Sequence, residues 1–142
     1  MLMANSLIEK LGWKPGMGTE IWRLPTALKI ELAQLEDARS DSPTFRIAFA
    51  RNAAELEEAA AQVAANYMAG GHLWLCYPKK SGRIKSDITR DVGWEPIHAL
   101  GLLGVRQIAL DEDWSALRFR FKEEIPVIMR SSPSGGRQKA NS

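Results

Sequence analysis

The side chains of this sequence most capable of chemistry lie in one short segment, residues 78–91. It follows an apolar run and contains five cations among small residues: Lys79, Lys80, Arg83, Lys85 and Arg90. Lysine ammonium groups attract phosphate and carboxylate as point charges, whereas arginines donate to them in a two-pronged geometry. The segment therefore predicts a pocket for an anionic small molecule or a phosphate group.

Three neighbouring residues complete this candidate ligand-binding site. Asp87 and Asp91 lie within the segment, and Trp94 follows it closely. The alternative is a solvated loop in which the cations pair with the two aspartates, and Asp87 caps the next helical turn. The sequence leaves both interpretations open.

The remaining reactive residues predict neither a catalytic group nor a metal site. The two histidines, His72 and His98, and the single cysteine, Cys76, do not occur at metal-ligand spacing. Cys76 lies in the middle of an apolar pattern, where a thiol is inert. We therefore expect no catalytic residue, no metal and no cofactor, and a binding module in preference to an enzyme.

Alternating strand and helix patterns surround the candidate site. Strand patterns cover residues 19–24, 44–50, 72–77, 105–110 and 114–121, and helical patterns cover 7–11, 25–37, 53–69 and a short stretch from Pro96. This order predicts a single three-layer α/β domain over residues 1–128. Its sheet is mostly parallel, has about five strands, and ends in an antiparallel hairpin. Because such sheets bind ligands at the carboxyl ends of their strands, we expect residues 78–91 at that edge.

Composition and charge exclude several classes of protein. The chain has 142 residues, and no run in it approaches the roughly 18 apolar residues of a membrane span. We expect a cytoplasmic protein that does not associate with membranes. The net charge is +2, but three positive charges lie in residues 129–142, which we expect to be a disordered basic tail. Since the rest of the chain is nearly neutral, nucleic acid is not the expected partner.

A protein partner or a second copy of the chain is an alternative to a small anion. Arginine and aromatic residues are enriched at interfaces, and Arg118 and Arg120 alternate with apolar residues in the last strand pattern. These arginines either lie on a solvated edge or form a second cationic group beside residues 78–91. In the interaction hypothesis, the hairpin edge and the basic surface bind the partner.

Two blocks of the sequence resemble a known family. They are "LWLCYPKKSGRIKSDITRDVGW" (73–94) and "IALDEDWSALRFR" (108–120). Both are similar to motifs of the DUF3052-like family of small bacterial proteins of unknown function, and the opening "LGWKPGMGTEIWRLP" is similar to the start of that family. The resemblance implies a shared fold and no assigned reaction.

The predicted layout also resembles the second half of a class I methyltransferase fold, in which the sheet likewise ends in an antiparallel hairpin. A nucleotide site in such a Rossmann-like fold needs glycines after the first strand. Here Gly16 and Gly18 precede the strand at 19–24, and the second strand ends in Arg51 and Asn52 instead of an acid. A degenerate S-adenosylmethionine-dependent enzyme is therefore only the enzymatic alternative.

Overall fold

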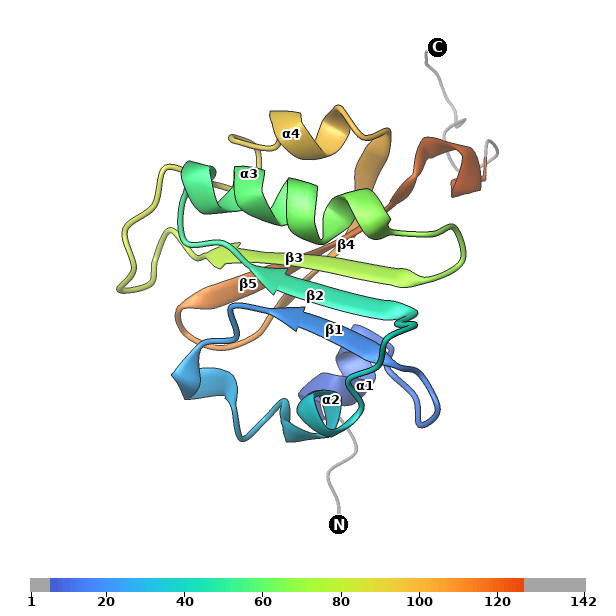
Figure 1. Cartoon of the computed structure of the whole chain (residues 1–142). Helices are drawn as coiled ribbons and strands as arrows, with labels where there is room; N and C mark the ends of the chain where they lie inside the picture. The colour runs from blue at the N-terminus through green and yellow to red at the C-terminus, as the bar shows by residue number, and fades with distance from the viewer. Residues whose placement is uncertain (1–5, 127–142) are drawn as a thin grey trace.

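The computed structural model describes residues 6–126 as an α/β fold around one five-stranded mixed sheet (Figure 1). Its elements are α1 (Leu7–Leu11), β1 (Thr19–Trp22), η1 (Thr26–Leu28), α2 (Ala33–Asp37), β2 (Phe45–Phe49), α3 (Ala53–Gln62), η2 (Ala64–Asn66), β3 (His72–Pro78), α4 (Glu95–His98), β4 (Leu102–Ala109), β5 (Trp114–Phe121) and η3 (Lys122–Glu124). The predicted tail at 129–142 lies outside the described residues.

The strand directions divide the sheet into two parts. In the order β1-β2-β3-β5-β4, the first three strands are parallel, and β5 is antiparallel to both of its neighbours. The α/β class, the five strands and the antiparallel hairpin were predicted correctly. The parallel part is confined to the three N-terminal strands.

A short bridge on the outer edge of β1 explains why helices cover both faces. The Thr19 N–H donates to the Ala38 carbonyl at 2.9 Å, and Thr19 bridges Arg39 in parallel. The chain thus crosses from β1 through α2 to the outer edge before it returns to β2. Because crossovers are right-handed, this outward crossover places α2 on the opposite face from α3, which connects β2 to β3 (Figure 1).

Each face of the sheet has its own apolar core. One cluster joins α3 and α4 to Leu73, Leu75 and Tyr77 of β3, and the other joins α1 and α2 to Trp74 and Cys76. Alternate side chains of β3 are therefore buried on opposite faces, which accounts for its continuous apolar sequence. Cys76 is buried, as predicted, and this burial raises the pKa of its thiol, which disfavours the reactive thiolate.

The helix predicted at 25–37 is divided into η1 and α2. Leu28, Leu32 and Leu35 are all buried, as their spacing indicates, whereas Ile30 between them is 87% exposed. The pattern therefore identified the buried side chains correctly but not the backbone hydrogen bonds, since two short turns bury the same leucines as one helix would.

Candidate anion-binding loop at the carboxyl edge

The basic segment leaves the sheet where the sequence predicts. β3 is the middle strand and ends at Pro78, so residues 79–94 begin at the carboxyl edge of the parallel strands. Figure 1 shows this segment extending beyond the arrowheads of β2 and β3. We call residues 79–91 the basic loop.

Asp113, in the turn between β4 and β5, fixes the first part of the basic loop. Its carboxylate accepts from the Arg83 backbone N–H at 2.9 Å and from Arg83 Nη2 at 2.6 Å. Its carbonyl accepts from the Lys79 N–H at 2.8 Å. A Cβ on Gly82 would lie 2.9 Å from the Asp113 Cα, so this approach requires glycine. The Arg83 guanidinium in turn lowers the pKa of Asp113.

The Arg83 contact corrects the predicted role of that residue. The solvated-loop alternative pairs the cations with Asp87 and Asp91, but Arg83 pairs with Asp113, in the turn between β4 and β5. Since its charge is already compensated, Arg83 is less available to a ligand than the other cations of the loop.

Asp87 fixes the middle of the basic loop to α3. Its Oδ1 accepts from the Ala53 N–H at 2.8 Å, while Asn52 Oδ1 accepts from the Glu55 N–H at 2.9 Å. Asp87 therefore caps the preceding helix, α3, and not the next helical turn as the sequence suggested. It satisfies one of the N–H groups that a helix leaves free at its start.

Trp94 closes the loop from inside the core. The residue is 4% exposed, and its Nε1 donates to the Thr89 carbonyl at 2.7 Å. Its ring packs at 5.4 Å from Tyr77 and 5.3 Å from Phe119, measured between ring centroids. Trp94 therefore positions the loop, and its ring is too buried to stack on a ligand at the surface.

Four cations of the loop remain available. Lys80, Lys85 and Arg90 are exposed, and Lys79 is partly buried. Within residues 6–126, no carboxylate lies within 4.0 Å of their charged groups. Asp91, the remaining predicted site residue, is also exposed and forms no ion pair in this range.

Two of these cations, Lys79 and Arg90, lie near different side chains and mark two groups. Lys79 lies near Asp113 and lowers the pKa of that carboxyl. Arg90 and Asp91 lie near Tyr77, whose pKa is raised chiefly by burial, while Arg90 lowers it and Asp91 raises it. Beside the first group is an open hollow of about 510 Å³, where Lys79 and Arg83 face the acids of residues 111–113.

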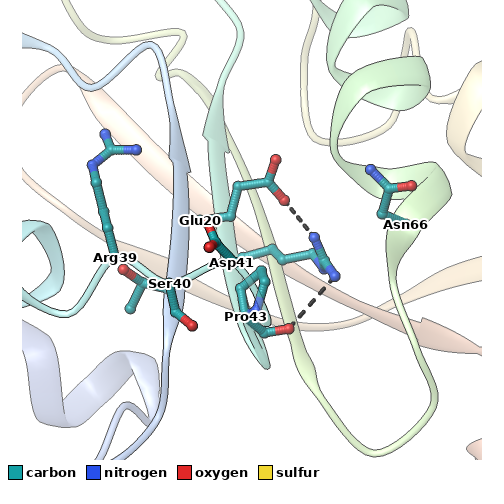
Figure 2. A pocket seen from close by; sticks show the side chains of 8 residues that line it. Glu20, Arg39, Ser40, Asp41, Pro43 and Asn66 are labelled. Atoms are coloured by element: carbon teal, nitrogen blue, oxygen red, sulfur yellow. Dashed lines mark hydrogen bonds and ion pairs between the residues drawn. The ribbon is translucent and has the colours of Figure 1, made fainter.

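A larger hollow lies at the opposite edge, where β1 and β2 begin. It measures about 800 Å³, and Arg46 there pairs with Glu20 and donates to the Pro43 carbonyl at 3.5 Å (Figure 2). Figure 2 shows Arg39 directed away from this pair. Arg39 pairs instead with Glu36, with 3.2 Å between Nε and Oε1. Because its arginines are already paired, this hollow offers little free charge to a ligand.

Arg118 and Arg120 do not lie beside the basic loop. Arg118 is opposite Trp74 in the sheet and donates to the Gly71 carbonyl at 3.3 Å, at the start of β3. The basic loop begins at the other end of the same strand. The prediction that these arginines join the loop cations is therefore wrong, because β5 runs antiparallel to β3.

Comparison with known proteins gives no assignment: the chain matches no protein-family model and no curated protein. Within residues 6–126, no group of three or more histidine, cysteine or acidic side chains could hold a metal ion. No helix in this part of the chain is long and apolar enough to cross a membrane.

Proposed function

We propose that the protein is a non-catalytic module that binds an anionic small molecule or a phosphate group through the basic loop. One observation carries the proposal. Asp113 and α3 hold the loop at the carboxyl edge of the middle strand, and Lys79, Lys80, Lys85 and Arg90 have no acidic partner within residues 6–126. Ligands of α/β sheets bind at this edge.

The contacts of Asp87 and Asp113 with the rest of the chain also support a site that is organised before a ligand binds. The acids at 87 and 113 accept from backbone and arginine donors, and neither forms an ion pair with a lysine of the loop within residues 6–126. A fixed loop loses less conformational entropy on binding than a mobile one. We therefore expect the loop to bind with little rearrangement.

The test is a series of thermal shifts with inorganic phosphate, pyrophosphate and citrate at matched ionic strength. The variants are Lys79→Gln/Lys80→Gln and Lys85→Gln/Arg90→Gln. The matched control is Lys10→Gln/Lys29→Gln, which removes two exposed lysines outside the loop. We expect pyrophosphate to raise the melting temperature of the wild type and the control, and to lose at least half of that effect in either loop variant. An equal response in all four proteins would reject the loop as the site.

Binding of another protein, or of a second copy, is the alternative function, and the edge strand β4 favours it. Within the described sheet, the outer edge of β4 has no neighbour, and Leu103 and Val105 on this strand are 38% and 40% exposed. Edge strands without protection pair with other chains. Sedimentation of the wild type and of Val105→Lys tests this: a monomer in both, at all concentrations, counts against self-association.

A degenerate methyltransferase-like enzyme is the weaker alternative. Strand directions support the fold likeness, since β5 runs against the other strands of the described sheet. The expected ligand crevice, between the carboxyl ends of β1 and β2, contains Arg23 and Arg51, which pair with Glu58 and Glu55 at 3.2 and 2.8 Å. Both arginines are already paired with acids of α3. Calorimetry with S-adenosylmethionine should therefore show no heat of binding.

We also propose membership of the DUF3052-like family and a three-layer arrangement. The two sequence blocks that resemble this family contain most of β3 and β5, which are adjacent in the sheet, with Pro78 opposite Trp114. The separate apolar clusters on the two faces of the sheet support the three layers.

A further inference from the structure

Three arginines share one face of the hairpin, at the end of β3 away from the basic loop. Arg118 and Arg120 alternate along β5, and Arg106 of β4 lies directly opposite Arg118. Arg118 also lies opposite Trp74, whose side chain packs with α1. Cross-strand neighbours project from the same face of a sheet, so all three arginines lie on the α1 side. We call Arg106, Arg118 and Arg120 the arginine face.

Two donors on the arginine face are buried without an acceptor. The Nε atoms of Arg118 and Arg120 are shielded from solvent and have no hydrogen-bond partner in the described chain. A buried donor without a partner is costly, and such groups are rare in folded proteins. The other contacts of these guanidiniums are long: 3.3 Å to the Gly71 carbonyl and 3.5 Å to Glu124.

The nearby carboxylate of Glu124 compensates the arginine face only in part, through its ion pair with Arg120. Glu124 already accepts from the Tyr67 hydroxyl at 2.7 Å, from the Gly70 N–H at 2.9 Å and from the Phe121 N–H at 2.8 Å. Residues 1–5 and 127–142 contain no aspartate or glutamate, so their side chains offer no further carboxylate. Within residues 6–126, only Arg120 of the three arginines forms an ion pair, and its partner Glu124 also accepts three other hydrogen bonds.

The positive potential is strong enough to affect neighbouring groups. The pKa of Arg118 is lowered first by burial and then by Arg120, while Tyr67 and Glu124 raise it and Arg106 makes a smaller lowering contribution. The pKa of His72 falls to about 4, first through burial and then through Arg118, Arg120 and Lys14. Like charges that lie directly opposite in a sheet destabilise it. An anion at this face would relieve the repulsion, and the unpartnered Nε–H groups would donate to it once the guanidiniums turn toward it.

We propose that the arginine face binds the phosphate group of a small phosphate monoester. Guanidinium groups match the geometry of phosphate oxygens, and three of them balance the two negative charges of a monoester better than the single charge of a carboxylate. Leu103 lies opposite Arg120 and is 38% exposed, so it offers an apolar contact for the organic part of the ligand. His72 and Lys14 border the site on its other side.

Calorimetry with phenyl phosphate tests the site, with inorganic phosphate as the probe that lacks the organic part. Arg106→Gln removes one charge without removing a hydrogen bond seen in the described chain, so it should fold. We expect it to weaken phenyl phosphate binding about tenfold. Arg118→Lys keeps the charge but loses the Nε–H, and it should weaken binding as well. The control is Lys29→Gln, which should bind as the wild type does.

An NMR titration of His72 gives a second readout that a structural role would not change. The charged groups facing this ring are Arg118 and Arg120 from β5 and Lys14 before β1, while Phe45 of β2 stacks on it. Bound phosphate offsets the arginines, so the pKa of His72 should rise from about 4 toward its ordinary 6.5. The basic-loop variants should leave this rise unchanged.

The outcomes separate this site from the basic loop. Loss of phenyl phosphate binding in the loop variants, with Arg106→Gln unaffected, would overturn the arginine face and support the loop. An unchanged His72 pKa at saturating phenyl phosphate would also overturn it. If a single-stranded oligonucleotide binds this face more tightly than phenyl phosphate does, the assignment to a small monoester is wrong.

Discussion

The basic loop and the arginine face lie at opposite ends of β3 and hold their positive charges in different ways. In the loop, Asp87 and Asp113 fix the backbone, and most of the cations project into solvent. On the arginine face, three guanidiniums crowd together beside one occupied glutamate. The loop therefore has more unpaired cations, but the cations of the arginine face are closer together and less solvated.

This difference shows that the density of cations in a sequence is a poor measure of electrostatic strain. A solvated lysine lowers the stability of the fold very little, because water stabilises its charge in every conformation that the side chain adopts. A guanidinium packed between like charges, with a shielded Nε–H, is destabilising unless an anion binds there. The predictions below test this contrast, in order of decreasing effect.

Replacement of Trp94 should have the largest effect, because this residue supports the basic loop from the core. Trp94→Ala should lower the free energy of unfolding by about 3–5 kcal/mol, the usual cost of removing a large buried aromatic side chain. Trp94→Phe should lower the free energy of unfolding by a smaller amount, because the phenyl ring fills part of the same space. Urea denaturation gives both values. A loss below about 1 kcal/mol would show that the ring is not part of the core.

Lowering the pH should destabilise the protein through His72. The unfolded chain takes up this proton near pH 6.5, but the folded protein takes it up only near pH 4, so stability falls as the pH drops between these values. Allowing for the partial exposure of the ring, the loss is about 2 kcal/mol at most. His72→Gln should remove the part of this loss between pH 6.5 and 4.5. An identical slope in the variant would contradict the lowered pKa.

Removal of the Asp87 carboxylate should release the basic loop from α3. Asp87→Ala should cost about 1 kcal/mol, as expected for loss of a helix cap, and should speed hydrogen exchange at Ala53. Asp87→Asn keeps an acceptor oxygen and should cost less. Equal stability in all three proteins would argue against this anchor.

Relief of crowding on the arginine face should stabilise the protein without a ligand. Arg106→Gln removes the charge opposite Arg118, so it should raise the melting temperature in low salt by about 2–4 °C. The gain should shrink in 0.5 M salt, since salt screens the repulsion. A lower melting temperature in this variant would mean that Arg106 has a stabilising contact.

The exposed lysines of the basic loop should give the smallest effect. Lys80→Gln and Lys85→Gln should each change the melting temperature by less than about 3 °C, because neither side chain has an ion partner within the described residues. A larger loss in either variant would show that the lysine contributes to the fold.

Most of the fold could be predicted from the sequence because it depends on local periodicity. The apolar run at 72–77 predicted the buried middle strand, and Asn52 predicted the start of α3. The position of the basic loop then followed from the edge rule for α/β sheets. The division of the helix at 25–37 could not be predicted, since the same leucine spacing fits both arrangements.

The contacts of the candidate site could not be predicted, because they join residues distant in the chain. Arg83 and Asp113 are 30 positions apart, and their pairing depends on where the turn between β4 and β5 lies. The arginine face likewise depends on strand register. The alternation of Arg118 and Arg120 is visible in the sequence, but the position of Arg106 opposite Arg118 is not. Register is a tertiary property, and a shift of one residue would turn these side chains to the other face.

The most direct test of the arginine face follows the side-chain Nε–H signals of Arg118 and Arg120 during a titration with phenyl phosphate. Both donors are buried and lack acceptors in the described chain, so a bound phosphate should shift both signals saturably and slow their exchange with water. Signals that stay unchanged while the ligand reaches millimolar concentration would contradict the proposed site.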